Sequence, residues 1–316
     1  DIPCQAACPA RTNVPLYIEY LASDDPTASY AVNLECNVFP GVLGRVCTRP
    51  CEDQCRHQWT NTQGPVTICH LKRSAADRTV DASAPKAWFS ETKKKIAVIG
   101  AGPAGLTAAR ELRRFGHSVS LFEKEPKPGG MMTYGIPRFR LPRDVVEREI
   151  DLIIRTGVDL HLSKAITAET LDEICTNYDA VCIATGTNRV NSLEIDGIPS
   201  SSLTSGLDFM YRYNNGDITS LTGDVVIIGG GFTAVDCARS SARAARKLLG
   251  AEGNISIFYR RTEHFMAANQ DELEEMEAER IDIRTLATPV CGKMENGQIK
   301  AVVFRRNVLD PKSPDE

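Results

Sequence analysis

Two stretches of the chain share a pattern in which an apolar run leads directly into a glycine-rich turn and then a helical segment. The first consists of the run 96–99, the turn GAGPAG at 100–105 and a helix expected over 106–115. The second repeats it with the turn GGGFTA at 229–234 and a helix expected over 235–249. Strand, glycine turn and helix form the first part of a βαβ unit. The sequence therefore predicts an α/β protein with two parallel, Rossmann-like sheets.

The glycines of the first turn have separate roles in such a unit. Gly100 permits the tight turn, Gly102 lets the backbone approach a pyrophosphate, and Gly105 allows the helix to pack closely on the strand. The helix N-terminus offers free N–H groups to phosphate oxygens. The next expected strand, 118–122, ends at Glu123, where a carboxylate can hold the hydroxyls of a ribose. The first unit thus suits the ADP half of FAD.

The second unit differs at the same position. Its following strand, expected over 255–259, ends in Arg260 and Arg261 instead of a carboxylate. Two guanidinium groups favour a ribose that carries an extra phosphate, and hence NADPH over NADH. An ordinary solvated strand end is the alternative for the arginines, and Glu263 nearby keeps NADH open.

Two such units in one chain predict a flavin site and a nicotinamide site, with a hydride passing from the nicotinamide to the flavin ring. Between them, the apolar run 181–183 leads into Ala184-Thr185-Gly186. This tight turn is a candidate crossover between the two domains.

Cysteines are concentrated at the front of the chain. Seven of the eleven lie in the first 69 residues, in runs that include Cys4-x3-Cys8-Pro9 and Cys47-x3-Cys51-x3-Cys55. One helix, over 15–21, is expected between these runs. Disulfides would suit a secreted protein, but no export signal is present. Structural zinc is compatible with the spacing, and so is an iron–sulfur cluster, whose corners need thiolates from different directions. The dinucleotide units favour iron–sulfur, because an electron carrier beside a flavin has a use.

Composition excludes several other classes of protein. With 42% hydrophobic and 25% charged residues the chain is of ordinary globular composition. Its 37 Lys and Arg against 41 Asp and Glu give a net charge of −4, which offers no general attraction for nucleic acid. No stretch approaches the roughly 18–20 apolar residues of a membrane span, and no signal peptide is evident. We expect a cytoplasmic protein in which no side chain must act as a catalytic acid or base.

A further motif carries a family resemblance. Gly129-Gly130-Met131, followed by YGIPRFRLP at 134–142, resembles the flavin-loop signature of the glutamate synthase small-subunit family. That family includes the N-terminal half of dihydropyrimidine dehydrogenase and electron-input subunits of several redox enzymes. Supporting segments are Cys8-Pro9, Gly44–Cys47, Gly64–Ile68, Ala184–Gly186, Gly231–Asp236 and Tyr259–Arg261.

The resemblance implies a domain order. It implies a helical [4Fe-4S] domain at 1–90, the first part of an FAD domain at 91–200 and an incomplete NAD(P)H domain at 201–316. The family's return segment of the FAD domain would follow residue 316. A Cys-x2-Cys pair of the first cluster would fall before residue 1. We therefore expect the sequence to be part of a longer protein.

Site residues follow from the resemblance position by position. Cys4 and Cys55 match ligands of one cluster, and Cys8, Cys47 and Cys51 match ligands of the other. The second cluster's fourth ligand can be a Gln or Glu in relatives, but Lys72 stands at that position here, and an ammonium cannot bind iron. Cys69, one helical turn earlier on the same face, is our candidate replacement, with a simple buried thiol as the alternative. The matching FAD positions are Gly100, Gly102, Ala104, Gly105, Glu123, Lys124, Gly130, Met131 and Arg140. The matching NADPH positions are Gly230, Gly231, Thr233, Arg260 and Arg261.

The function implied is that of an electron-input flavoprotein subunit. NADPH would reduce FAD, and single electrons would pass through [4Fe-4S] clusters to a larger redox subunit or a ferredoxin-type carrier in a hetero-oligomer. One alternative is a glutamate synthase small subunit proper, feeding a glutamate-forming large subunit. Another, of a different class, is a non-catalytic scaffold with a zinc-bound front.

Overall fold

The computed structural model describes residues 2–60, 64–80, 82–187, 190, 192–246, 253–268 and 270–309. The chain divides into two compact units. Unit 1 comprises Asp1–Thr133 and Arg138–Gly186, and unit 2 comprises Tyr134–Pro137 and Thr187–Glu316. The expected crossover at 184–186 thus lies where the chain leaves unit 1. The three-domain division at 90 and 200 stays a prediction.

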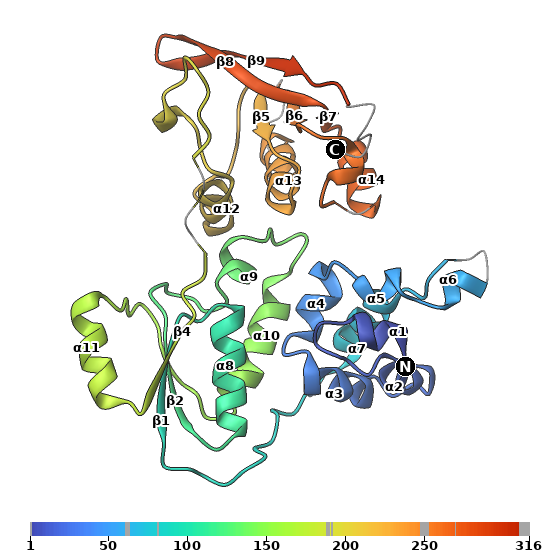
Figure 1. Cartoon of the computed structure of the whole chain (residues 1–316), viewed down its shortest axis with the longest axis vertical. Coiled ribbons are helices and arrows are strands. Elements are labelled where there is room, and N and C mark those ends of the chain that lie inside the picture. The colour runs from blue at the N-terminus through green and yellow to red at the C-terminus, as the bar shows by residue number, and fades with distance from the viewer. Residues whose placement is uncertain are drawn as a thin grey trace. The chain divides into compact units, whose positions relative to one another are not determined.

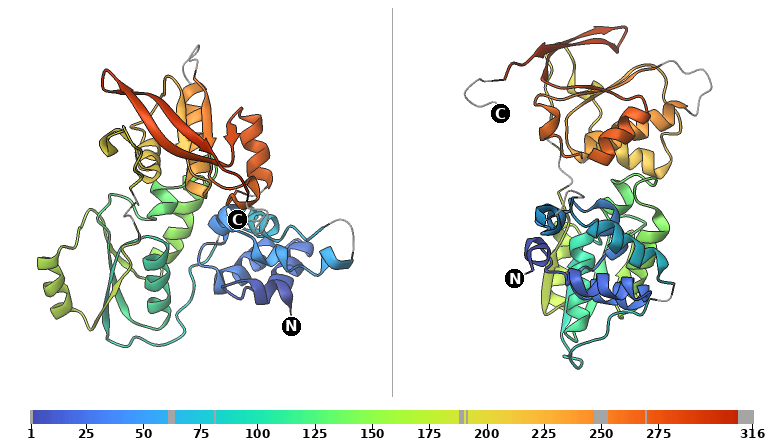
Figure 2. Two further views of the ribbon diagram at one scale, coloured as in Figure 1. Left: turned by 45° about the horizontal axis from the view of Figure 1, so that its top comes forward. Right: turned by 90° about the vertical axis from the view of Figure 1, so that its right-hand side faces the viewer.

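Unit 1 opens with a helical module. Its helices are α1 (Pro3–Ala7), α2 (Val14–Ala22), α3 (Pro26–Cys36), α4 (Pro40–Val46), α5 (Pro50–Asp53), α6 (His57–Thr60) and α7 (Ile68–Arg78). Figure 2 shows these helices gathered into one group at the blue end of the chain. The first five each carry a proline in the first turn, where its missing N–H costs nothing.

The expectation of one helix between the cysteine runs was incomplete. The predicted helix over 15–21 is α2, but α3 and α4 also lie between the runs. The segment of α3, PTASYAVNLEC, has little helical periodicity in hydrophobicity, and its N-terminus is stabilised by Asp25, whose carboxylate accepts the N–H of Ala28 at 2.9 Å. Its inward face carries Tyr30, Asn33 and Leu34, and a mixed face of this kind gives no clear apolar stripe.

A four-stranded parallel sheet follows in unit 1. Its strands are β1 (Lys95–Ile99), β2 (Ser118–Phe122), β3 (Asp159–His161) and β4 (Ala180–Ile183), in the order β3-β2-β1-β4. Helices α8 (Pro103–Arg114) and α10 (Arg143–Ile154) lie on one face, and α11 (Ala168–Asn177) lies on the other (Figure 1). The strand predicted over 96–99 is confirmed as β1, and the helix expected over 106–115 is α8, which begins earlier, at Pro103. The short α9 (Met131–Tyr134) directly follows Gly129 and Gly130 of the flavin-loop motif.

Unit 2 contains a smaller parallel sheet. Strands β5 (Val225–Ile228), β6 (Ile255–Phe258) and β7 (Asp282–Arg284) pair in that order, and β8 (Ala287–Glu295) and β9 (Gln298–Arg306) form an antiparallel hairpin. The helices are α12 (Gly206–Asn215), α13 (Phe232–Arg246) and α14 (Gln270–Ala278), with 3₁₀ turns η1 (Ser200–Ser202) and η2 (Glu263–Phe265). The helix expected over 235–249 begins at Phe232, and its last three expected residues lie outside the described residues.

Each sheet is built on buried apolar residues. Ala97, Val98 and Leu121 are fully enclosed in unit 1, and Ile257 and Met276 in unit 2. The predicted α/β class, with two parallel Rossmann-like sheets after a helical Cys-rich part, is confirmed. Within the described ranges, no helix combines the length and apolar character needed to cross a bilayer.

Candidate cofactor sites

The first glycine turn can be built only from glycine at two of its positions. Gly100 has φ +104°, and a Cβ there would lie 2.3 Å from the carbonyl oxygen of Ala184. A Cβ on Gly105 would lie 1.8 Å from the carbonyl oxygen of Gly100. The turn is therefore pressed between β4 and the first turn of α8, as the sequence pattern predicts.

A second glycine loop lies against this turn within unit 1. The N–H of Gly129 donates to the carbonyl of Ala101 at 2.7 Å. Gly130 has φ +51°, and a Cβ there would lie 2.8 Å from the Cα of Gly102. The flavin-loop motif and the first turn, far apart in sequence, thus meet backbone to backbone. A Cβ on Gly102 itself would have Gly130 no nearer than 3.9 Å, so this position has space beside it, where a pyrophosphate would meet the N-terminus of α8.

Glu123 stands beside the same turn. It is only 7% exposed, and its Oε2 accepts the N–H of Ala101 at 2.7 Å. Its Oε1 accepts the N–H of Glu125 at 3.0 Å. Two backbone donors therefore fix the carboxylate at the end of β2. Its contact with a ribose stays a prediction.

The remaining predicted FAD residues differ in burial. Ala104, Lys124 and Met131 are exposed, and Arg140 is half-buried. The Nζ of Lys124 lies 3.7 Å from Glu125 in an ion pair at the surface. Their roles in binding FAD stay predictions.

The second glycine turn is more open. Gly229 has φ +144°, and its N–H donates to the carbonyl of Phe258 at 3.0 Å. A Cβ on Gly230 would lie 2.6 Å from the Tyr259 ring, whereas a Cβ on Gly231 would have no described atom within 4 Å. Thr233 is exposed in the first turn of α13. The turn thus keeps free space at its tip.

Arg260 and Arg261 follow β6 beside this turn, and both are exposed. Their backbone is fixed: the carbonyl of Arg260 accepts the side-chain amide of Asn307 at 2.8 Å, and that of Arg261 accepts the N–H of Leu286 at 3.0 Å. The Arg261 guanidinium lies 5.7 Å from the ring centre of Phe265. Two cations on a fixed backbone suit an added phosphate group.

The cysteine module brings together residues from three helical elements. Cys47 follows α4, Cys51 lies in α5 and Cys69 lies in α7. The Cys69 thiol interacts with the thiols of both Cys47 and Cys51. A close approach of two helices allows this, because a Cβ on Gly44 would lie 2.8 Å from the backbone of Arg73. Cys69 is 1% exposed, and its role as the replacement ligand stays a prediction.

Hydrogen bonding shifts the pKa values of these three thiols in opposite directions. The Cys69 thiol lowers the pKa of Cys47 to about 6 and lowers the pKa of Cys51. The same bonds, together with burial, raise the pKa of Cys69. Lys72 is only 4% exposed, and its positive charge favours the thiolate at all three cysteines.

Contacts of two other front cysteines, Cys4 and Cys8, are also defined. The charge of Cys4 couples to Cys55 and Cys51, and burial raises the pKa of Cys4. The Sγ of Cys8 lies 3.3 Å from the Thr12 hydroxyl.

Sequence reasoning missed one polar partner of the cysteine module. Glu52 Oε1 accepts the N–H of Cys69 at 2.8 Å and so joins α5 to the start of α7. Its position directly after Cys51 is the signal that could have found it.

The donor chemistry fits an iron–sulfur group. All eleven cysteines are free thiols, so the disulfide alternative is wrong for this structure. Among the described residues, no three His, Cys, Asp or Glu side chains are grouped so that they could hold a metal ion as they stand. Thiols that converge from separate turns, with a buried cation favouring thiolates, match what a cluster with several iron corners requires. Assignment of the individual ligands stays a prediction.

Two family models match the chain. Residues 94–307 match the pyridine nucleotide-disulphide oxidoreductase model. Residues 1–84 match the model described as dihydropyrimidine dehydrogenase domain II, 4Fe-4S cluster. Together they confirm the predicted resemblance and the predicted FAD, NADPH and [4Fe-4S] cofactor classes, and they disfavour the zinc alternative.

Curated relatives match almost the whole chain. It is 35% identical to the NADP(+)-dependent formate dehydrogenase subunit beta of Moorella thermoacetica, over 99% of this chain and 47% of that protein. It is 35% identical to the NADPH-Fe(3+) oxidoreductase subunit beta of Geobacter sulfurreducens, over 97% and 46%. The small chain of glutamate synthase [NADPH] from Azospirillum brasilense is 31% identical over 90% and 61%. The chain thus spans about half the length of the first two relatives.

Solved structures show the same fold at low identity. FprA of Mycobacterium tuberculosis in complex with NADPH is 18% identical with a TM-score of 0.54, covering 67% of each chain. A 2-naphthoyl-CoA reductase complex is 19% identical with a TM-score of 0.56, covering 94% of this chain and 45% of the other.

Proposed function

The chain belongs to the pyridine nucleotide-disulphide oxidoreductase family, and on that premise we propose that it is the electron-input part of a larger redox enzyme. When bound, the flavin accepts a hydride from NADPH, and the iron–sulfur clusters accept single electrons. The acceptor proposed is a second redox subunit or a ferredoxin-type carrier in a cytoplasmic hetero-oligomer. Two of the relatives are themselves named as beta subunits, which supports this assembly.

The observation that carries the proposal is the convergence of Cys47, Cys51 and Cys69 in the same compact unit as the first glycine turn. A flavin-type turn needs no thiols for its own chemistry. Thiols in the same unit could hold iron–sulfur clusters, which would provide a one-electron route away from the flavin.

The chain's own residues have separate tasks in this proposal. Gly102, Gly130 and the start of α8 would hold the flavin pyrophosphate, and Glu123 the adjoining ribose. Gly230 and Gly231 would receive the NADPH pyrophosphate, and Arg260 with Arg261 the 2′-phosphate. Cys4 and Cys55 would hold one cluster. Cys8, Cys47, Cys51 and Cys69 would hold the other.

The acceptor distinguishes two candidates within the family. The relatives act, by their names, in formate, Fe(3+) and glutamate reactions. A glutamate synthase small subunit proper is the second candidate, supported by the relative from Azospirillum brasilense, of which the chain covers 61%. Copurification of the full-length protein from its natural host identifies the partner subunit directly.

Iron content tests the cluster proposal. The full-length protein, purified without oxygen, is compared with a Cys69→Ser variant and with a Cys36→Ser control, because Cys36 is exposed and matches no ligand position. We expect the Cys69 variant to lose the iron and sulfide of one cluster while it keeps its flavin. If the Cys69→Ser variant keeps all its iron and sulfide, Cys69 is not a cluster ligand but a buried thiol. A wild-type protein with zinc and no flavin would support the scaffold alternative instead.

A further inference from the structure

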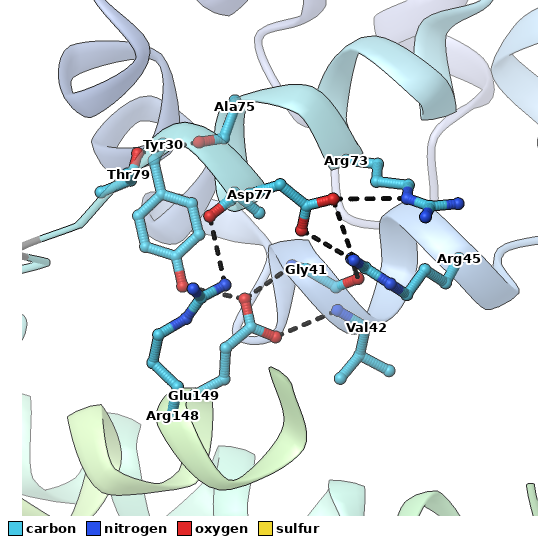
Figure 3. Close-up of polar contacts among 11 residues, drawn as sticks. Tyr30, Gly41, Val42, Arg45, Arg73, Ala75, Asp77, Thr79, Arg148 and Glu149 are labelled. Carbon is cyan, nitrogen blue, oxygen red and sulfur yellow. Dashed lines mark hydrogen bonds and ion pairs between the residues drawn. The ribbon is translucent and has the colours of Figure 1, made fainter. Parts of the chain in front are cut away.

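A buried carboxylate links the cysteine module to the helices of the flavin-type sheet. Glu149, in the middle of α10, has no exposed surface. Its Oε1 accepts the N–H of Gly41 at 2.6 Å and the Tyr30 hydroxyl at 2.8 Å. Its Oε2 accepts the N–H of Val42 at 3.1 Å. Figure 3 shows the carboxylate pointing away from α10 into the first turn of α4.

Such an arrangement is costly unless every acceptor is satisfied. Burial raises the pKa of Glu149, and the three donors oppose that shift. Burial and the neighbouring carboxylate raise the pKa of Tyr30, so its hydroxyl stays a donor. Gly41 completes the fit, because a Cβ there would lie 3.0 Å from Glu149 Oε1. Replacing one partner would leave buried polar groups unpaired.

Two arginines make the complementary contacts with helix C-termini in the module. Arg148 of α10 donates to the carbonyl of Ala76 in the last turn of α7 at 3.1 Å, and Figure 3 shows it beside Glu149. Arg110 of α8 is 1% exposed and donates to the carbonyl of Leu34 in the last turn of α3. Cations at helix C-termini are favoured because they meet unpaired carbonyls and the negative end of the helix dipole.

Two of the contacted helices, α4 and α7, adjoin or contain a predicted cluster ligand. The helix α4 begins at the turn that Glu149 holds and ends at Cys47. Arg45 of α4 donates to both carboxylate oxygens of Asp77 in α7, at 2.7 and 2.9 Å (Figure 3). This contact joins α4 to the helix that contains Cys69. On the other side, α10 begins directly after the flavin-loop motif.

We propose that Glu149 is a positioning residue that holds the cysteine module at one fixed distance from Gly129 and Gly130, the part of the flavin-loop motif that lies in the same unit. The inference rests on the proposed function. It bears on a step in which a bound, two-electron-reduced flavin would give one electron to a cluster held by these cysteines and would release a proton to solvent. Transfer of this kind slows steeply as distance grows, and a site of fixed geometry needs supporting contacts outside it.

The test measures two steps separately in the full-length holoenzyme, purified without oxygen. Rapid mixing with NADPH follows the bleaching of flavin absorbance and the later bleaching of iron–sulfur absorbance. The variants are Glu149→Gln, which keeps the shape but places an amide donor against backbone donors, and Tyr30→Phe, which removes one bond. Glu147→Gln, on the exposed side of the same helix, is the matched control.

We expect Glu149→Gln to keep its iron content and its rate of flavin reduction while cluster reduction slows by about tenfold or more. Tyr30→Phe should slow cluster reduction by about twofold to threefold, because the two backbone donors to Glu149 remain. The Glu147 control should match wild type. Hydrogen exchange at the start of α4 should rise in Glu149→Gln without any cofactor chemistry being involved.

Distinct results would overturn the two proposals. Unchanged cluster reduction in both Glu149→Gln and Tyr30→Phe, or equal slowing of both steps, would overturn the positioning role. If Glu149→Gln does not fold, Tyr30→Phe decides alone. A wild-type protein whose clusters never bleach with NADPH would instead overturn the proposed function.

Discussion

The two glycine turns share one fold and differ in how tightly they are enclosed. In the first, Gly100 and Gly105 leave no space for a Cβ, and Glu123 caps the turn from a buried position. In the second, the tip at Gly231 is open and the neighbouring strand ends in exposed Arg260 and Arg261. An enclosed turn suits a cofactor that stays bound, and an open turn beside cations suits one that comes and goes. The motif alone therefore sets the fold, while its surroundings set the ligand.

The largest effect is expected from a methyl group in the first turn. Gly105→Ala forces a Cβ to within 1.8 Å of a backbone oxygen, so unit 1 should lose about 3 kcal/mol or more of stability, and with it the flavin. Gly231→Ala in the open turn is the control and should fold normally. Thermal unfolding and flavin content measure both. An equal loss of thermal stability and flavin content in the two variants would contradict the proposed difference between the turns.

A gentler change separates folding from binding. A Cβ on Gly102 has a described neighbour no closer than 3.9 Å, so Gly102→Ala should fold, but its methyl group would occupy the space for the pyrophosphate. We expect flavin affinity to fall by at least about tenfold with little change in the unfolding temperature. Titration of the flavin-free variant measures this. Normal flavin affinity would place the pyrophosphate elsewhere.

The next change concerns the choice of nicotinamide cofactor. Replacing Arg260 and Arg261 by Gln removes two charged donors, each worth about 1.5–3 kcal/mol at a paired site. KM for NADPH should rise by about a hundredfold or more, while KM for NADH changes little. Steady-state kinetics with both cofactors decide the point, since an equal rise for both would remove the assignment to the phosphate.

The smallest effect concerns pH. Burial raises the pKa of Glu149 above its ordinary range, so the folded protein holds that proton more tightly than the unfolded chain does. Its contribution is fully present below the ordinary carboxyl pKa and is lost as pH rises through the raised value. The stability of wild type relative to Glu149→Gln should therefore fall as pH rises from the ordinary carboxyl pKa through the raised value. Urea unfolding at a series of pH values measures it, and a relative stability that rises with pH would contradict the sign.

Local patterns predicted much of this molecule. The order of strand, glycine turn and helix could be predicted because residues close in sequence, or next to the adjoining strand, leave no room for a side chain at Gly100 and Gly105. Cys69 was a candidate because it lies one helical turn before Lys72, the position where the family resemblance implies a ligand, and its role as a ligand stays a prediction.

Other features depend on contacts that no local pattern records. Helix α3 was missed because its buried face mixes Tyr30 and Asn33 with apolar residues, so its hydrophobicity has no clear period. Glu149 gave no signal, because its partners Gly41 and Val42 lie more than a hundred residues away in sequence. A carboxylate in an otherwise amphipathic helix is usually a solvated one.

One spectrum tests the central claim most directly. The full-length protein, purified without oxygen, is mixed with NADPH, and a fresh sample with NADH, while flavin and iron–sulfur absorbance are recorded. The account predicts rapid bleaching of both chromophores by NADPH and slower bleaching by NADH at the same concentration. A colourless protein, or flavin that bleaches while the iron–sulfur absorbance never changes, would contradict it.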